Sequence, residues 1–293
     1  MSYTHRIRRM AVSTLALAIA GAAHAQSAPL HLNVYHGDAN SFYVSATVVS
    51  GDTEALVIDS GFTRADALRV AANVLDSGKT LKTILVSNAD PDYYFGVEVL
   101  KAQFPQAQVV ATPAVLARIQ SLLDRKLAFW PPKMGANAPQ HPVLPVAMQG
   151  TTLTVDGQTV EVRGTTGPLA YRPYVWIPSI RTVAGNIAVF GNLHVWTADT
   201  QTPALRDAWR RQLDEIEALK PTTVVPGHML PGTAMDVGTI RYTREYLLRF
   251  ERELAKTRHS ADLIATMKQA YPDAGLDIAL QIGAKVGTGE MTW

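Results

Sequence analysis

Oxygen-bearing side chains gather in this sequence where a short apolar run ends. The run 84–86 leads into Asn88, Asp90, Asp92 and Tyr93 within a few residues. Strand ends that lead into polar loops are where α/β proteins usually place their chemistry. Carboxylate and amide oxygens suit a hard divalent cation. Two carboxylates without a cation would repel each other, so that one would tend to hold a proton. The stretch therefore predicts either a cation site or an acid–base site.

Two later junctions repeat this pattern of an apolar strand followed by polar residues. The run 186–190 leads into Asn192 and His194, and the run 222–225 leads into His228. Each junction places polar side chains at the end of a strand, as the first one does. A single histidine is more often a rim or core residue than a ligand, and both interpretations stay open for His194.

The strands and helices that must position these residues alternate along the chain. β-Branched and aromatic segments predict strands, and apolar residues at helical spacing predict helices. Strands are expected at 30–35, 42–49, 54–59, 82–86, 108–111, 151–165 (around a hairpin turn), 174–177, 186–190 and 222–225. Helices are expected at 63–75, 94–104, 113–127, 202–219, 239–257 and 261–270. Two β-rich sets in succession, each with helices, predict an α/β fold that is an αββα sandwich.

The helix expected at 63–75 has the clearest local signals. Thr63 is a candidate N-cap, and Asp66 would complete a capping box with it. One face of the helix carries a set of small and branched apolar residues, which should face the core: Ala67, Val70, Ala71 and Val74.

The segment 128–145 mixes aromatic residues with turn residues and differs from its surroundings. Trp130 and Met134 offer adaptable apolar contact, which predicts a loop or lid that faces a substrate. An ordinary connecting loop whose tryptophan packs on the core fits the same pattern, and both interpretations stay open.

The first 25 residues have the pattern of a secretory signal. Arg6, Arg8 and Arg9 precede the short apolar run 11–22, and Ala-His-Ala at 23–25 is a cleavage site. The mature chain 26–293 is then a single domain with C-terminal helices. Its 24 lysines and arginines (27 less these three) face 25 acids, a net charge of −1 instead of +2. The charge therefore gives no support to a nucleic-acid partner, and a small-molecule substrate is expected instead.

The chain has no cysteine, so it can form neither a disulfide nor a thiolate metal site. After the signal, the sequence has no apolar run long enough to span a membrane. We therefore expect a periplasmic or secreted bacterial protein, whose oligomeric state the sequence leaves open.

Four motifs in order resemble the metallo-β-lactamase superfamily over nearly the whole mature chain. They are Leu-Val-Ile-Asp59-Ser-Gly61, the strand that runs into Asn88, the run Val-Phe-Gly191-Asn192, and Thr-Val-Val-Pro-Gly-His228. The resemblance implies the αββα fold and a hydrolase. It also implies a site where two zinc ions lower the pKa of a bound water.

This chain departs from the pattern of that family at most of the metal ligands. The motif His-x-His-x-Asp-His is represented by Asn88, Asp90, Asp92 and Tyr93, so only its aspartate is kept. A further ligand histidine falls near Gly164 and is Thr165 here, and the bridging aspartate is Asn192. Of the ligand histidines that the resemblance implies, only His228 is present.

The ligand positions of the resemblance now carry mostly oxygen donors, which suit Ca²⁺, Mg²⁺ or Mn²⁺ better than zinc. We therefore expect at most one such cation. The expected ligand set is Asn88, Asp90, Asp92, Asn192 and His228, with His194 and Thr165 as additional candidates.

Three functions remain as hypotheses. The favoured one is an exported hydrolase with an oxygen-rich metal site, acting on a small carbonyl compound such as an ester or a lactone. Acyl-homoserine lactones are included, which would make it a quorum-quenching lactonase. The second is a non-catalytic protein that binds a small molecule. The third is a metal-independent hydrolase, with Asp92 as general base, Tyr93 or Tyr94 as acid, and His228 as proton shuttle. Asp90 and Asp92 could instead only form a turn and cap the next helix.

Overall fold

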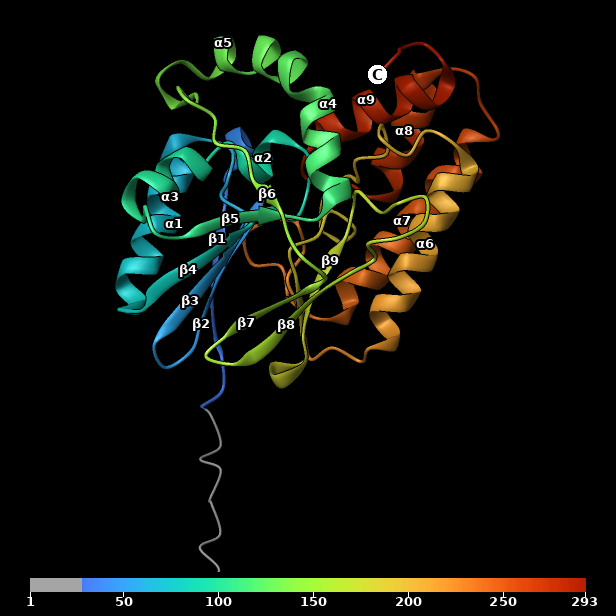
Figure 1. Cartoon of the computed structure of the whole chain (residues 1–293). Helices are drawn as coiled ribbons and strands as arrows, with labels where there is room; N and C mark the ends of the chain where they lie inside the picture. The colour runs from blue at the N-terminus through green and yellow to red at the C-terminus, as the bar shows by residue number, and fades with distance from the viewer. Residues whose placement is uncertain (1–27) are drawn as a thin grey trace, which may run out of the picture.

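The computed structural model describes residues 28–293 (Figure 1). The signal predicted at 1–25 lies outside these residues. Within the described part, no helix combines the length and the apolar character that a membrane crossing needs.

The first sheet comes from the N-terminal half of the chain. Its strands follow one another in chain order: β1 (His31–His36), β2 (Ser45–Ser50), β3 (Glu54–Ile58), β4 (Thr80–Leu85), β5 (Gln108–Ala111) and β6 (Val146–Ala147). The first three strands pair antiparallel, and β3 to β6 pair parallel. Helices between the parallel strands provide the crossovers that such pairing needs.

The second sheet has the strand order β12-β10-β9-β8-β7. These strands are β7 (Thr152–Val155), β8 (Gln158–Arg163), β9 (Tyr174–Ile177), β10 (Thr182–Ala184) and β12 (Thr223–Val224). The predicted hairpin joins β7 to β8. A separate two-stranded sheet pairs β11 (Phe190–Gly191) with β13 (His228–Met229).

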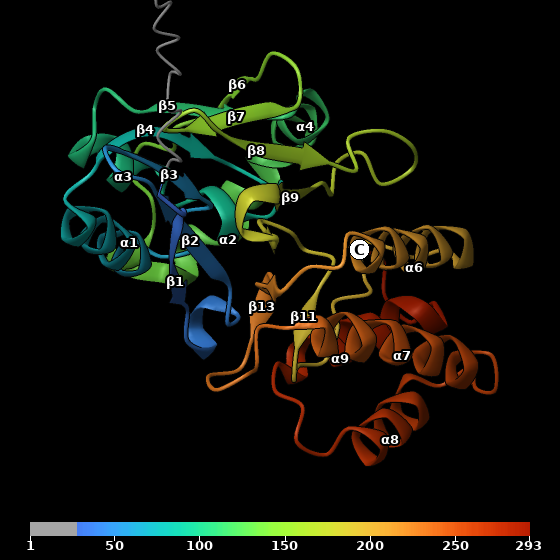
Figure 2. The same cartoon turned by 90° about the horizontal axis from the view of Figure 1, so that it is seen from below.

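Helices cover the outer face of each sheet, as Figures 1 and 2 show. The first sheet is covered by α1 (Arg64–Ser77), α3 (Val97–Gln103) and α4 (Pro113–Phe129). The second is covered by α6 (Pro203–Ala218) and α7 (Val237–Leu254), and α8 (Ser260–Ala270) and α9 (Asp277–Thr288) pack against α7. Short helices are α2 (Pro91–Tyr94), α5 (Pro131–Met134) and the 3-10 turns η1 (Ala39–Ser41), η2 (Gly135–Asn137) and η3 (Pro178–Ile180).

Three apolar cores correspond to these layers. One core lies between the first sheet and its helices, one between the second sheet and its helices, and one between the two sheets. The middle core joins residues of β3, such as Leu56 and Ile58, to residues of β8 and β9, such as Val160 and Val175. The αββα sandwich predicted from the sequence is thus confirmed.

Local signals predicted α1 correctly. The Thr63 hydroxyl accepts a hydrogen bond from the Asp66 amide, and the Asp66 carboxylate accepts one from the Thr63 amide. This capping box satisfies two amides at the helix start. The predicted apolar face is buried.

Two expectations about the elements were wrong, and one helix was not expected. The helix expected at 94–104 is divided into α2 and α3 at Gly96. A Cβ on Gly96 would lie 2.1 Å from the Ser60 carbonyl oxygen, so this close approach of two backbones requires glycine. The strand expected at 186–190 is paired only at β11. Helix α9 was not expected, and it contributes to the site described below.

The two halves of the sandwich are joined at the end where the polar junctions lie. The Ser45 amide donates to the Gly227 carbonyl at 2.8 Å, and Val44 forms a bridge with His228. The start of β2 in the first sheet therefore positions β13, which carries His228 from the C-terminal half.

Candidate functional site

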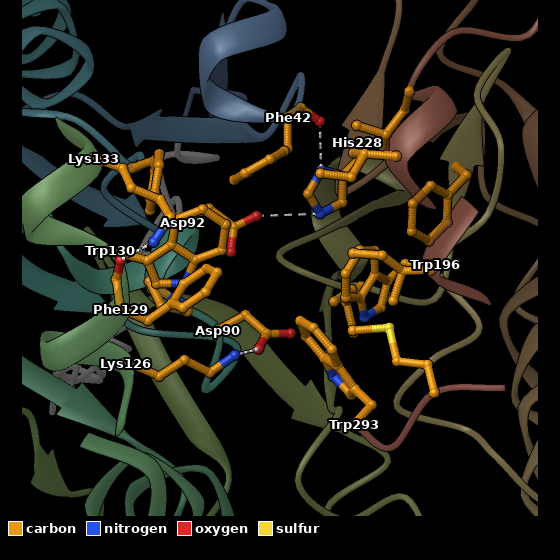
Figure 3. Close-up of a pocket in the computed structure, with 18 residues that line it drawn as sticks. Phe42, Asp90, Asp92, Lys126, Phe129, Trp130, Lys133, Trp196, His228 and Trp293 are labelled. Carbon is orange, nitrogen blue, oxygen red and sulfur yellow. Dashed lines mark hydrogen bonds and ion pairs between the residues drawn. The ribbon is translucent and has the colours of Figure 1, made fainter. Parts of the chain in front are cut away.

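A cavity of about 310 Å³ lies between residues of the two halves of the chain (Figure 3). This volume is at the lower end of the range for small-molecule sites. Its walls are mainly apolar and come from both halves, with seven aromatic residues among them: Phe42, Phe62, Phe129, Trp130, Phe190, Trp196 and Trp293. Charged or titratable side chains reach it at five places: Asp90, Asp92, Lys126, Lys133 and His228. The site is thus an apolar pocket with a small polar group on its wall.

Asp92 and His228 form the centre of this polar group. Asp92 Oδ2 lies 3.5 Å from His228 Nε2, and both residues are buried. His228 Nδ1 lies 2.9 Å from the carbonyl oxygen of Phe42. A carbonyl only accepts hydrogen bonds, so Nδ1 carries the proton and donates it. In the neutral ring, the lone pair of Nε2 then faces Asp92.

Aromatic neighbours hold the His228 ring in this orientation. The Phe190 ring stacks on it with centroids 5.2 Å apart and planes inclined by 10°, and the Tyr93 ring meets it edge-on at 5.7 Å. These contacts and the Phe42 hydrogen bond leave the ring little freedom, so Nε2 has a fixed direction.

Burial shifts the pKa values of this pair in opposite directions. Burial lowers the pKa of His228 to about 4, because it disfavours the imidazolium. Burial, and then repulsion by Asp90, raises the pKa of Asp92 well above its usual range. Above the pKa of His228 and below the raised pKa of Asp92, the pair therefore holds one exchangeable proton on Asp92 beside a neutral imidazole.

Asp90 forms an ion pair with Lys126. Asp90 Oδ1 lies 3.3 Å from Lys126 Nζ, and Lys126 is only 8% exposed. Asp90 is the N-cap residue of α2, but its side chain makes no capping hydrogen bond. The interpretation of Asp90 as only a cap is therefore wrong, since its carboxylate faces Lys126.

Asn88 does not face the cavity. Its side-chain oxygen accepts a hydrogen bond from the Asp90 amide at 2.9 Å, which closes a local turn. The residue is buried beside a smaller cavity of about 20 Å³ that Asp90 also lines.

Three other predicted site residues lie outside the cavity wall. Asn192 is exposed, and its amide donates to the Thr233 hydroxyl at 3.2 Å. His194 is buried, with Nδ1 3.0 Å from the Tyr246 hydroxyl oxygen. Thr165 is half-buried and lines neither cavity. Asn192, expected as a ligand, and Thr165, an additional candidate, therefore do not line the cavity with Asp92.

Tyr93 lies behind the pocket wall. It is fully buried, and its hydroxyl donates to the Asn186 carbonyl at 3.2 Å. It supports the His228 ring, and nothing bound in the cavity would touch it directly. Its predicted role as a catalytic acid is therefore not supported by its position.

The two residues predicted to face a substrate have different positions. Trp130 lines the cavity and also packs against Phe62 and Phe42, with ring centroids 5.3 and 5.4 Å apart. The tryptophan thus packs on the core and also lines the cavity, and its contact with a substrate stays a prediction. Met134 does not line the cavity and packs against the core of the first sheet instead.

The donor atoms were compared with the metal site that the resemblance implies. Asp92 and His228 have the spacing of two ligands on one tetrahedral ion, for which bonds of about 2.0–2.1 Å give roughly 3.4 Å. A third protein ligand is missing. Within residues 28–293, no group of three histidine or carboxylate side chains could hold a metal ion. The nearby Lys126 ammonium also disfavours a second positive charge. These residues do not fit the zinc centre of the family.

Lys126 was not among the predicted site residues, although the sequence contains a signal for it. It follows Ile119 by seven residues and Val115 by eleven, on the stripe of α4 that is buried. A lysine at a position where the helical pattern predicts an apolar residue is unusual and often has a partner in the interior.

Comparison with known proteins identifies the family of this chain. A family profile described as "Metallo-beta-lactamase superfamily" matches residues 39–228. No curated protein sequence matches the chain.

Solved structures with the same fold were also found. A metallo-beta-lactamase family protein from Thermus thermophilus is similar with a TM-score of 0.62 and 17% identity, over 89% of this chain and 93% of that one. A metallo-beta-lactamase from Pontibacter korlensis has a TM-score of 0.54 and 18% identity, over 76% of this chain and 96% of that one. At such identities, the likeness concerns the fold alone. The profile match and the sandwich together show that this chain belongs to the metallo-beta-lactamase superfamily.

Proposed function

We propose that this protein is an exported hydrolase that cleaves an ester or lactone bond of an apolar small molecule at the Asp92–His228 pair. The fold supports a hydrolase in general, because members of the superfamily are mostly hydrolases. Of the three hypotheses, the metal-independent one is supported best. The observation that carries it is the buried carboxylate–imidazole pair on the wall of an otherwise apolar cavity.

The pair is suited to move a proton during hydrolysis. Above the raised pKa of Asp92, the carboxylate and the Nε2 lone pair are both unprotonated. One of them accepts a proton from water as the water oxygen bonds to the substrate carbonyl carbon. When the carbon–oxygen bond to the alcohol breaks, that proton passes to the leaving alkoxide. The Phe42 hydrogen bond supports this role because it keeps Nε2 directed at Asp92.

The cavity favours a substrate with an acyl or aryl group. Its aromatic walls would bury apolar atoms, each methylene contributing about 0.8 kcal/mol. An acyl-homoserine lactone combines such a chain with a lactone carbonyl, as do simpler alkyl esters and lactones. A panel that varies the chain and the head group separately distinguishes these classes.

Export rests on the pattern of residues 1–25. We propose a periplasmic or secreted location, with a mature chain that starts at Gln26. Fractionation of the producing bacterium and the N-terminal mass of the purified protein test this. An intact N-terminus in the cytoplasmic fraction would contradict export and leave the site unaffected.

The proposed activity is tested with p-nitrophenyl esters of increasing chain length and with acyl lactones, before and after chelation. We expect turnover that chelation does not change, and a loss of turnover in His228→Gln. His194→Gln is a matched control, because His194 is also buried and hydrogen-bonded through Nδ1 but does not reach the cavity. Turnover that needs added Mn²⁺, Ca²⁺ or Zn²⁺ would instead support the metal-dependent hypothesis.

A non-catalytic binding protein is the second candidate, which the predominance of apolar residues on the cavity wall favours. In that case, members of the panel would raise the melting temperature without being cleaved. If substitution of a residue that lines the cavity abolished this rise in melting temperature, the ligand would bind in the cavity.

A further inference from the structure

We propose that Lys126 provides the positive charge of this site and binds the carboxylate or oxyanion of an apolar acyl compound, at the place where the family has a metal. The catalytic part of this inference rests on the proposed function, whereas the binding part does not. The mismatch between the donor set and the family's metal centre leads directly to it.

The position of Lys126 is costly without a role in the interior. An ammonium group that is removed from water destabilises the folded protein unless it is paired and hydrogen-bonded. The residue is 8% exposed on the buried stripe of α4, and its Nζ reaches the same cavity as Asp92 and His228 (Figure 3). The helix thus directs the lysine stem through an apolar environment to the polar group on the cavity wall.

The ammonium group has donors to spare. Lys126 has three N–H groups, and Asp90 Oδ1 at 3.3 Å is its single hydrogen-bond acceptor within the described part of the chain. The ring of Trp293 lies 5.8 Å from Nζ and adds a weaker cation–π contact. Two N–H groups are therefore available to an anionic oxygen in the cavity.

The second lysine on the cavity wall is used differently. Lys133 Nζ donates to the Phe129 carbonyl at 2.9 Å and lies 3.6 Å from the centroid of the Phe129 ring. Lys133 is exposed, so water screens its charge. Lys126 is thus the better-placed cation, because its charge acts in a less polar environment.

The charges around Lys126 are compatible with an added anion. Asp90 and Lys126 form an ion pair whose two charges balance. A carboxylate that enters with an apolar tail would meet Lys126 at one end and the aromatic wall along its length. The class of ligand is therefore an acyl compound with anionic oxygen, either a bound acid or the oxyanion formed during hydrolysis.

Binding of octanoate and of its uncharged amide, octanamide, tests the inference without any turnover. In Lys126→Met, which keeps an unbranched apolar stem, we expect octanoate to bind at least 10-fold more weakly and octanamide to bind as before. Lys126→Arg should retain binding of octanoate. Equal affinities of the original protein and Lys126→Met for octanoate, measured by calorimetry, would overturn the assignment.

A second variant keeps the test valid if Lys126→Met does not fold. Asp90→Asn removes the carboxylate that engages Lys126 and leaves the lysine in place. We expect octanoate to bind more tightly to Asp90→Asn than to the original protein, and octanamide to bind equally to both. Weaker binding of octanoate to this variant would contradict the inference.

Chemical rescue tests the catalytic part. Lys126→Ala should lose at least 10-fold in kcat, and added methylammonium or ethylammonium should restore part of it. Rescue by Zn²⁺ or Mn²⁺ but not by these amines would overturn the role of the lysine. If the original protein cleaves no ester or lactone, the proposed function fails, and the octanoate experiment still decides whether Lys126 binds anions.

Discussion

The Phe42 carbonyl oxygen accepts a hydrogen bond from His228 Nδ1 at 2.9 Å, and this contact determines which ring nitrogen faces the cavity. Phe42 has a φ of 55° at the end of η1, so a left-handed residue directs this carbonyl at the imidazole. Such a conformation is uncommon for a bulky side chain. The local backbone of the N-terminal half thereby sets the tautomer of a histidine in the C-terminal half.

Substitution of Asp92 tests the centre of the proposed site. Asp92→Asn removes the carboxylate and keeps the size of the side chain, so the fold should be retained. We expect kcat to fall by roughly 10²–10⁴-fold, the usual contribution of general acid–base catalysis. Ester hydrolysis under saturating substrate measures this. Asn192→Asp is an informative control, because Asn192 is exposed and lies off the cavity wall, and it should leave kcat unchanged.

The activity should depend on pH through Asp92. Its pKa is raised by burial and by repulsion from Asp90, and the base must be unprotonated. The rate should therefore rise with pH and reach its plateau well above the range of an ordinary carboxyl group. His228, with a pKa of about 4, is already neutral throughout this range and adds no limb above about pH 5. A profile of kcat/KM between pH 4 and 9 measures the limb. A rise in kcat/KM centred near pH 4 would contradict a pKa of Asp92 that burial raises.

Much of the fold was predictable because its signals are local. The capping residues of α1, the hairpin between β7 and β8, and the apolar runs of the strands each act over a few residues. The division of the helix at Gly96 was not predictable, because it results from contact with Ser60, which is distant in sequence.

The candidate site was predicted in part for a similar reason. Asp92 and His228 do meet, since both end up at the same edge of the sandwich. Asn192 was expected with them because of the family resemblance, but it has a φ of 55°, and its side chain donates to Thr233 instead. Lys126 and the wall from α9 depend on tertiary packing, which periodicity alone does not specify.

Metal binding should be weak. Asp92 and His228 offer two donors with a suitable spacing, but a third protein ligand is missing within residues 28–293 and Lys126 lies nearby. We expect calorimetric titration with Zn²⁺, Mn²⁺ or Ca²⁺ to show at most weak binding to the original protein. Lys126→Met should bind these ions more strongly, because it loses a competing positive charge. A stoichiometric metal in protein purified without chelator would contradict this prediction.

Asp59 should make the stability of the protein depend on pH. It is buried at the end of β3, and its two oxygens accept hydrogen bonds from the amide and the hydroxyl of Ser87, both at 2.7 Å. Burial raises its pKa from 3.8 to about 7. A carboxyl group with a raised pKa in the folded state binds a proton more tightly there than in the unfolded chain. Its contribution to stability is complete below pH 3.8 and is lost as the pH rises through about 7.

Asp59→Asn removes this titration and keeps an oxygen for the Ser87 amide. Each unit of pKa shift corresponds to about 1.4 kcal/mol. The original protein should therefore lose up to a few kcal/mol between pH 4 and 8 relative to Asp59→Asn. Unfolding by urea at several pH values, compared between the two proteins, measures the difference. Parallel pH dependences would show that Asp59 ionises in the folded state as freely as in the unfolded chain.

The aromatic wall formed by Trp196 and Trp293 should control the affinity for apolar substrates. The two rings pack edge to face with centroids 5.2 Å apart. Asp199 accepts a hydrogen bond from each indole, at 2.6 Å from Trp196 and 3.1 Å from Trp293. Asp199 does not line the main cavity, so it acts by positioning the two rings. This places a half-buried carboxylate behind the wall.

We expect Trp293→Ala to raise KM for long-chain esters by roughly 10-fold, as loss of about 1.4 kcal/mol of apolar contact would do. Short-chain esters should be affected less, and kcat should change little, because the Asp92–His228 pair is intact. Trp293→Phe keeps a ring but cannot donate to Asp199, so its effect should be intermediate. Gln201→Ala, which loses only a hydrogen bond to the Trp293 carbonyl, serves as the control. A fall in kcat at constant KM for all chain lengths would instead mean that the wall acts on the reacting groups.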